Sequence, residues 1–398
     1  MKIVLTTVGS RGDIQPVLAL SILLQDAGHD VIVAGPPENR GWVESRSIRF
    51  YQVGSDFMAF VARFPDVHSP RHARAILRFL KREALCQFET YPALFKGADV
   101  VLAASLSFAA PSVCEKMGIP YWFIVFCPQV FPSVHHLAVI ARNHTRSRLW
   151  NRMTWYADTL ADRILFRPMI NRCRRIIRLS PVQESSLEHL LGRRPVLAAD
   201  EVLAPLPDDV TLPVTRIGSL QLPRDRPLSD GLRRFIGEGT PPVYVGFGSM
   251  PHYHHQAVAD MVLQAVRSLG QRLIFACGIE KLIFGDCYFV AEAAHPELFP
   301  RLSIIVHHGG AGTTATASRS GVLQILVPHI LDQFYWAHHV HRLGIGPKPI
   351  WRTRLNQRRL QGRLSSVLGD PGYRYRARLV RKALRSGHQA DVVAKILS

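Results

Sequence analysis

Short apolar runs alternate with amphipathic stretches from the first residue of the chain. Residues 1–7 are rich in Ile, Val and Leu, which is typical of a buried parallel strand. In residues 14–27 the apolar side chains recur at helical spacing, and Gly28 ends this pattern. The run HDVIVAG follows and indicates a second strand. A strand, a helix and a second strand in this order predict one right-handed βαβ unit.

The alternation is interrupted between residues 218 and 242, where Pro, Gly, Asp and Arg predominate. It begins again with the apolar runs VYVGFGS, RLIFAC, LSIIVH and LQILVP, and helical patterns accompany them. The pattern predicts an α/β protein with an N-terminal domain at 1–217, a linker at 218–242, a second domain at 243–375 and a C-terminal helical segment at 376–398. Two such domains imply a cleft, because ligands of parallel sheets bind beyond the carboxyl ends of the strands.

Composition adds a strong positive charge to this picture. The 398 residues carry a formal net charge of +19, with 47% apolar and 20% charged side chains. Basic clusters such as RHARAILRFLKR and RPMINRCRRIIR place Ile, Leu and Phe between arginines at helical spacing. This favours an anionic membrane surface over nucleic acid as a partner, and no zinc-finger or RNA-binding signature is present. A plain solvated basic face is the alternative.

The sequence shows no sign of an exported or membrane-spanning protein. Its six cysteines are scattered without a C-x-x-C pair, which argues against a disulfide framework and a zinc cluster. The first residues lack the pattern of a signal peptide, and no apolar stretch reaches the ~18 residues of a membrane span. We expect a cytoplasmic protein that associates at most peripherally with the inner face of the membrane.

A glycine-rich turn between a strand and a helix carries the clearest chemistry. The strand ends at Val306, the residues HHGGAG form a tight loop, and Thr313 begins a helix. The free N–H groups and partial positive charge of a helix start, with hydroxyl and imidazole donors nearby, suit a diphosphate. The alternative is a glycine-rich turn with a capping threonine.

This loop and the following VPHILDQFYWAHHVHRLGIGPKPI resemble the nucleotide-sugar site of family 1 glycosyltransferases of the sterol and antibiotic type. The opening GSRGDIQP, the later VYVGFGSM and the element HPELF match the same group in order and spacing. The resemblance implies a GT-B fold, in which two Rossmann-like domains face each other across a cleft and a C-terminal helical segment crosses back to the first. It also implies inverting transfer of a hexose to a hydroxyl of a hydrophobic acceptor, such as a sterol, hopanoid, carotenoid or polyketide. UDP-glucose is the expected donor, and a dTDP-deoxysugar is the alternative.

The resemblance also assigns residues to the two substrates. The donor diphosphate is assigned to Ser249, His307, Gly309, Gly310, Gly312 and Thr313. The remaining assignments are Asp332 and Gln333 for the sugar, His295 for the nucleoside side, and Ser10, Arg11 and Gly12 for the acceptor-side loop. Related sequences usually have Gly before the Asp and Pro after the Gln. Leu331 and Phe334 stand here instead, so the identity of the sugar stays open.

Asp13 follows the first strand in the loop GSRGD, at the carboxyl end where a residue of the cleft must lie. In the family, an acidic or histidine residue of this loop takes the proton of the acceptor hydroxyl. The resemblance therefore implies that Asp13 is the general base. Two other interpretations exist: Asp13 only caps the following helix, or the tripeptide Arg-Gly-Asp is a cell-adhesion motif.

We expect neither a metal nor a cofactor. His338 and His341 share a helix face, but no third ligand follows at a useful spacing, and the chain has no Asp-x-Asp pair. A dinucleotide-dependent oxidoreductase is the rival enzyme class, but its Gly-x-Gly-x-x-Gly turn is missing after the first strand. The rival outside enzymes is a carrier that has lost its chemistry, against which the presence of Asp13, His307 and Gln333 argues.

Overall fold

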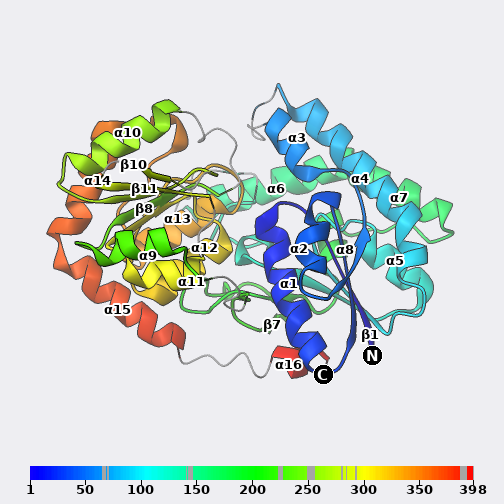
Figure 1. Ribbon diagram of the computed structural model, residues 1–398. Coiled ribbons are helices and arrows are strands. Elements are labelled where there is room, and N and C mark those ends of the chain that lie inside the picture. Colours follow the sequence, from blue (N-terminus) through cyan, green and yellow to red (C-terminus); the bar gives the residue numbers. More distant parts are fainter. Residues whose placement is uncertain are drawn as a thin grey trace. The chain divides into compact units, whose positions relative to one another are not determined.

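The computed structural model describes residues 1–64, 69, 71–139, 141, 147–222, 227–248, 256–278, 281–283, 285–291, 294–385 and 392–397. The chain divides into two compact units (Figure 1). Unit 1 comprises Met1–Ala199, Leu206–Leu222 and Gln389–Ser398, and unit 2 comprises Asp200–Pro205 and Pro223–His388. All six cysteines are free, as their scattered positions predict.

Unit 1 is built on a seven-stranded parallel sheet in the order β3-β2-β1-β4-β5-β6-β7. Its strands are β1 (Lys2–Val8), β2 (Asp30–Gly35), β3 (Arg49–Gln52), β4 (Val100–Ser105), β5 (Tyr121–Val125), β6 (Val196–Leu197) and β7 (Thr215–Arg216). Its helices are α1 (Arg11–Asp26), α2 (Arg40–Glu44), α3 (Phe57–Arg63), α4 (Ala73–Leu94), α5 (Ala110–Met117), α6 (Arg148–Leu165), α7 (Arg167–Ile176), α8 (Ser186–Leu191) and α16 (Val392–Leu397). Short 3₁₀ turns lie at Pro37–Asn39 and Pro128–Val130.

Unit 2 holds a six-stranded sheet in the order β10-β11-β9-β8-β12-β13, parallel except for β10. Its strands are β8 (Val243–Gly246), β9 (Leu273–Ala276), β10 (Lys281–Ile283), β11 (Cys287–Val290), β12 (Ile304–His307) and β13 (Leu323–Leu326). Its helices are α9 (Asp230–Gly237), α10 (Gln256–Arg267), α11 (His295–Leu298), α12 (Ala311–Ser320), α13 (Gln333–Arg342), α14 (Gln357–Gly369) and α15 (Pro371–Arg385). Short 3₁₀ turns lie at Phe299–Arg301 and Arg352–Arg354.

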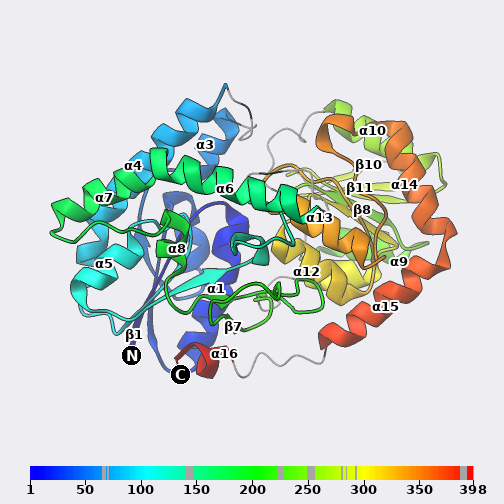
Figure 2. The ribbon, with the colours of Figure 1, turned by 180° about the vertical axis from the view of Figure 1, so that it is seen from behind.

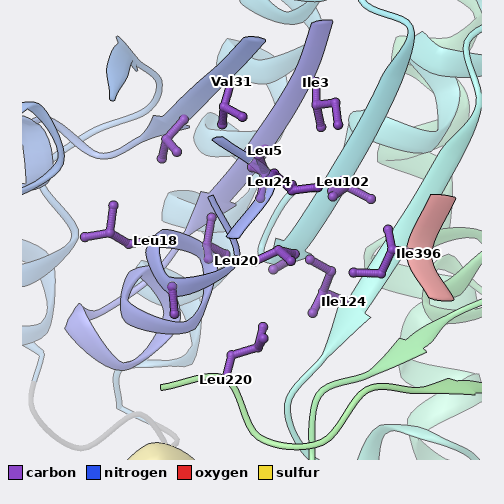
Figure 3. Close-up of a cluster of buried hydrophobic side chains, with 14 of the residues drawn as sticks. Ile3, Leu5, Leu18, Leu20, Leu24, Val31, Leu102, Ile124, Leu220 and Ile396 are labelled. Atoms are coloured by element: carbon purple, nitrogen blue, oxygen red, sulfur yellow. The ribbon is translucent and has the colours of Figure 1, made fainter. Parts of the chain in front are cut away.

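The core of unit 1 explains why the first βαβ unit forms as its pattern predicts. Leu5 of β1 and Leu18 of α1 are fully buried in one cluster, which excludes apolar surface from water. Helix α1 ends at the C-cap Ala27, and Gly28 follows with φ +83°, a conformation that favours glycine. Figure 3 shows Ile396 of α16 beside Ile124 of β5 in the same cluster. The end of the chain is thus part of unit 1.

The boundaries between the units differ from the predicted ones in two places. The predicted linker 218–242 contains α9, whose Leu232 and Phe235 are buried in the core of unit 2. The predicted C-terminal segment 376–398 is divided, because α15 packs on α12 within unit 2 and only the last residues join unit 1. A short piece at 200–205 also belongs to unit 2, where the Asp200 carboxylate accepts a 2.6 Å hydrogen bond from Arg319.

Candidate active site

The strand order reverses at one point in each sheet. In unit 1 this point lies between β1 and β4, and in unit 2 it lies between β8 and β12. Loops at the carboxyl ends of these strands are where open parallel sheets bind ligands, because the flanking connections leave on opposite sides and open a crevice. The loop after β1 holds the sequence GSRGD, and the loop after β12 holds HGGAG. Both predicted motifs therefore lie at the expected edge of their own sheet.

In unit 1 the Asp13 carboxylate is held from three sides. Its Oδ2 accepts hydrogen bonds from the Ser10 backbone N–H at 2.7 Å and from the Ser10 hydroxyl at 3.0 Å. Its Oδ1 accepts a 2.6 Å hydrogen bond from the hydroxyl of Ser105 at the end of β4. A carboxylate has about four acceptor positions, so one position on Oδ1 is not used by these three bonds.

The protonation of Asp13 follows from two opposing effects. Burial raises the pKa of the Asp13 carboxyl above its ordinary value, while the hydrogen bonds from Ser105 and Ser10 act to lower it. Burial is the larger effect. A carboxylate with a raised pKa is a stronger base than one in water, and its fixed hydrogen bonds hold its orientation.

Asp13 takes part in capping α1, although it is not the N-cap itself. Ser10 is the N-cap of α1, and Asp13 is the third helical residue that completes a capping box with it. The adhesion interpretation fails, because Arg11, Gly12 and Asp13 form the first helical turn and the carboxylate is turned toward Ser10 and Ser105. Among the predicted acceptor-side residues, Gly12 is exposed and donates its N–H to the Ser10 hydroxyl.

Arg11, the third predicted acceptor-side residue, lies with its guanidinium 4.7 Å from the ring centre of Trp42. This cation–π contact lies on the surface of unit 1, where Arg11 is exposed. Arg11 therefore has a structural contact of its own, and its placement does not depend on a bound phosphate.

Two residues around Asp13 were not found from the sequence. Ser105 lies 92 positions away and has φ +51°, an uncommon conformation for a residue with a side chain. Gly9 is needed for a different reason, because a Cβ added there would lie 2.4 Å from Asp13 Oδ2. The close approach of the carboxylate to the backbone therefore requires glycine at position 9.

In unit 2 the ring of His307, predicted for the diphosphate, is engaged by neighbouring residues of the protein. The ring is fully buried, its Nδ1 accepts the Gly309 N–H at 3.2 Å, and its Nε2 lies 3.0 Å from Gln324 Oε1. The Nε2–H must then be the donor to Gln324, whose own amide donates to Ser318 in α12. Burial is the main reason that the pKa of His307 is lowered to about 3, so its ring is neutral. Both nitrogens are engaged within the protein, so we expect His307 to support the loop, while its contact with the diphosphate stays a prediction.

The His307→Ala variant should therefore be unstable. The change leaves the Gly309 N–H and the Gln324 carbonyl without their buried partner and opens a cavity, so we expect the free energy of unfolding to fall by about 2–4 kcal/mol. Urea denaturation followed by circular dichroism measures this. His308→Ala is the comparison and should lose less stability, because the buried Nδ1 of His308 has no described hydrogen bond to lose. A stable His307→Ala protein that has lost nucleotide affinity would return His307 to the diphosphate.

His308 is the histidine whose surroundings suit an anion. A Cβ added at Gly248 would lie 2.8 Å from its Cε1, and one added at Gly310 would lie 2.6 Å from its Nε2. The ring thus lies between the loops that follow β8 and β12. Its Nδ1 is buried without a hydrogen-bond partner in the described part of the chain. Burial lowers the pKa of His308 to about 4, a direction that a bound anion would reverse.

The start of α12 supplies further donors beside this histidine. Its N-cap is Gly310. Because glycine has no side chain, no capping side chain blocks the first N–H groups of the helix. Gly312 and Thr313 are the second and third helical residues, and Gly312 is exposed. Gly309 has φ +91°, and a Cβ there would meet the Gln333 carbonyl oxygen at 3.1 Å. Ser249, predicted for the same diphosphate, lies outside the described residues.

The predicted sugar residues lie at the start of α13. Gln333 Oε1 accepts the backbone N–H of His329 at 2.8 Å and that of Ile330 at 3.2 Å. The amide N–H groups of the Gln333 side chain take no part in these two bonds. Asp332 is the N-cap of α13 but makes no side-chain capping bond, and its Oδ2 accepts the indole N–H of Trp336 at 3.1 Å. The Asp332 side chain therefore does not cap α13.

The two departures from the family pattern have structural consequences. Leu331 has φ +49°, which explains why glycine usually precedes the Asp here. Phe334 is buried and packs against Trp351, with ring centres 5.1 Å apart. Leu331 is exposed, so of the two it is the side chain available to a ligand at this corner.

His295, predicted on the nucleoside side, begins α11. Its Nε2 lies 3.1 Å from the Tyr244 hydroxyl, and its ring stacks on buried Phe299 with centres 4.3 Å apart. These contacts fix the plane of the ring beside β8. Elsewhere, in unit 1, His135, Asp208 and Asp209 form the one group of described residues with the spacing of metal ligands. This group is exposed, and Asp209 already accepts hydrogen bonds from Ser133 and Val134.

Comparison with known proteins agrees with this architecture. The glycosyltransferase family 28 N-terminal domain matches residues 3–135, and the erythromycin biosynthesis protein CIII-like C-terminal domain matches residues 290–398. The chain is 35% identical over 358 residues to the vancomycin aglycone glucosyltransferase of Amycolatopsis orientalis, with 87% of this chain and 85% of that protein covered. It is 29% identical over 402 residues to a sterol 3-beta-glucosyltransferase of Arabidopsis thaliana, with 92% of this chain and 63% of that protein covered.

Among solved structures, the glycosyltransferase VinC in complex with dTDP is similar in fold. Its TM-score is 0.69 at 20% identity, with all of this chain and 98% of that chain covered. The two parallel-sheet units therefore form a GT-B fold, and the protein is an enzyme of the glycosyltransferase class that uses nucleotide-sugar donors. The chain belongs to the family 1 glycosyltransferases of the family 28 and erythromycin CIII-like type, which includes glycopeptide and sterol glucosyltransferases.

Proposed function

We propose that this enzyme transfers a hexose from UDP-glucose to a hydroxyl of an apolar acceptor, with inversion at the anomeric carbon and without a metal. In the proposed reaction the acceptor O–H gives its proton to Asp13. The acceptor oxygen bonds to the anomeric carbon, whose bond to the phosphate oxygen breaks. The nucleoside diphosphate leaves with the negative charge that accumulates on its phosphate oxygens. One displacement without a covalent intermediate inverts the configuration.

One observation carries this proposal. The Asp13 carboxylate lies at the point of unit 1 where the strand order reverses, with a raised pKa, three fixed hydrogen bonds and one acceptor position not used by them. A proton acceptor in this state needs little reorganisation when the acceptor hydroxyl approaches. In unit 2, we assign the leaving diphosphate to His308 and the first N–H groups of α12, since an uncapped helix start and an imidazole donor both favour negative charge.

A donor and acceptor screen tests the proposal. Thermal shift with UDP, dTDP, UDP-glucose and dTDP-glucose ranks the donors, and mass spectrometry then detects hexose addition to sterol, hopanoid, carotenoid and polyketide alcohols. We expect UDP-glucose to be the best donor. Preference for a dTDP-deoxysugar would replace the donor assignment, and failure of every nucleotide to stabilise the protein would overturn the proposal.

The Gln333→Glu variant should separate sugar binding from loop support. Glutamate keeps an oxygen that can accept the N–H groups of His329 and Ile330, but it lacks the amide donors. We expect turnover to fall about 10- to 100-fold while affinity for the free nucleoside diphosphate is unchanged. Gln333→Ala is the comparison, which should also lower the melting temperature. Equal losses of turnover and nucleotide affinity in Gln333→Glu would show that Gln333 only holds the loop.

A further inference from the structure

Helix α6 of unit 1 carries a continuous apolar stripe that the other described elements of unit 1 do not cover. Its members recur at spacings of four, three, four and four residues, which places them on one face of a helix. They are Leu149, Met153, Tyr156, Leu160 and Ile164, exposed by 71%, 53%, 73%, 46% and 65%. The stripe is about 22 Å long at the rise of an α-helix. Exposed apolar surface of this extent is costly in water unless a partner covers it.

The opposite face of α6 attaches the helix to unit 1. Asn151 and Trp155 are buried there, and their side chains donate to the backbone carbonyls of Val134 and His136. The two carboxylates of the helix follow at the same helical spacing, and Asp162 accepts the backbone N–H of Ser186. The outward stripe therefore has no carboxylate, and the helix does not need it for its own packing.

Arginines border the stripe and continue onto α7. Arg152 and Arg163 are exposed on one flank of the stripe. On α7, Arg172 and Arg175 are exposed beside Ile176, which is 71% exposed. Figure 2 shows that α6 and α7 follow each other along one side of unit 1. Arginines beside exposed apolar side chains suit a phosphate group attached to an acyl chain.

We propose that the stripe on α6, with its flanking arginines and the exposed arginines of α7, is a docking face for an anionic lipid bilayer. The apolar side chains would enter the boundary of the acyl chains, and the arginines would meet the lipid phosphates. Trp150, which is 52% exposed, and Tyr156 have the amphipathic rings favoured at that depth. None of the described helices has the length and hydropathy needed to cross a bilayer, so contact would be interfacial.

Charge distinguishes this partner from a second copy of the chain. A symmetric dimer through α6 would bring the arginines of two chains, each with net charge +19, against one another. An anionic surface instead attracts each arginine near it. The benefit of docking rests on the proposed function, since an apolar acceptor is most concentrated in the bilayer. The docking itself can be measured without any activity.

The test uses the full chain and two kinds of vesicle, one of phosphatidylcholine and one of phosphatidylcholine mixed equally with phosphatidylglycerol. We expect cosedimentation with the mixed vesicles only. Met153→Glu combined with Leu160→Glu should weaken binding at least about 30-fold, because two charges would enter the apolar boundary. Arg152→Gln combined with Arg163→Gln should weaken it about 30-fold and lessen its dependence on salt.

The matched control lies on α15, which is also basic and has exposed apolar residues. Tyr375 and Leu379 are 65% and 50% exposed, so Tyr375→Glu with Leu379→Glu makes the same change in charge at similar exposure. We expect this pair to bind vesicles like the wild type. Loss of binding in this pair alone would move the docking face to α15 and overturn the proposal.

Two other results would also overturn it. One is wild-type protein that ignores both vesicles or binds them equally. The other is a wild-type dimer, seen by light scattering, that Met153→Glu with Leu160→Glu converts to monomer. Transfer to a detergent-dispersed acceptor should be unchanged in all three double variants, because none of them changes a residue of the active site. This assay therefore reports the reaction separately from docking. A wild type that binds anionic vesicles but transfers no sugar would remove the proposed function and keep the docking face.

Discussion

The Asp13→Asn variant should lose about 10²–10⁴ in turnover, the usual worth of a positioned general base, while donor binding stays normal. The amide oxygen of Asn can accept the bonds from Ser10, and its N–H₂ can donate to the Ser105 hydroxyl in place of the present bond. The geometry is thus preserved and only the ability to accept a proton is lost. Initial rates at saturating donor, with donor affinity from calorimetry, measure the effect.

The Asn variant should be at least as stable as the wild type at neutral pH. The pKa of Asp13 is raised in the folded protein, so its contribution to stability is full below the unfolded pKa and is lost as the pH rises through the folded pKa. At neutral pH the wild type therefore carries the cost of a buried charge, which Asn removes. Asp13→Ala is the control, because it loses the same activity and also about 1 kcal/mol of stability from the capping box.

Ser105 gives an independent check on the same base. Ser105→Ala removes a hydrogen bond that lowers the pKa of Asp13, so the acid limb of the rate profile should move to higher pH while the plateau is retained. In Asp13→Asn the residual activity should lack that limb. Near-normal turnover in Asp13→Asn would show that Asp13 serves only in the capping box. An acid limb that stays at the same pH in Ser105→Ala would show that Ser105 does not affect the pKa of the base.

The alternating pattern of the sequence was sufficient to predict the two α/β units. Buried parallel strands such as β1 and β12 are apolar on both faces and therefore read as unbroken runs. The prediction of a linker at 218–242 missed a short helix, because Pro and Gly dominate the composition of this stretch. Ser229 accepts the N–H of Leu232 as the N-cap of α9, and Phe235 follows three residues after Leu232. The serine and this apolar spacing were the available signal.

The details of the site depend on geometry that a linear pattern does not contain. His307 and His308 are adjacent at a strand end, where successive side chains point to opposite faces. Two adjacent histidines in the sequence do not indicate which of the two rings enters the core beside Gln324. The contact between Asp13 and Ser105 depends on β1 and β4 being neighbours in the sheet, where Val8 pairs with Ser105. The capping box was within reach, since Ser10 and Asp13 have its spacing of three.

The exposed stripe of α6 is a second feature that the sequence pattern alone does not predict. Its helical spacing is plain in the sequence, but a periodic apolar face normally predicts core packing. Only the structure shows that Asn151 and Trp155 take that inward position and that the longer apolar face is turned outward. Periodicity therefore predicts the helix, while the direction of its apolar face requires the neighbouring elements.

The His308→Ala variant should weaken binding of the nucleotide sugar about 10- to 100-fold, the worth of one charge-assisted hydrogen bond. His308 is neutral in the free protein, since burial lowers its pKa to about 4. A diphosphate beside the ring would raise that pKa, so binding should take up protons and affinity should increase as the pH falls toward 5. Calorimetry in two buffers of different ionisation enthalpy counts these protons. The sugar diphosphate is the ligand of choice because its two phosphates stay singly ionised over this range. His308→Ala should bind without the extra uptake, and equal uptake in variant and wild type would assign the proton, and with it the diphosphate contact, to another group.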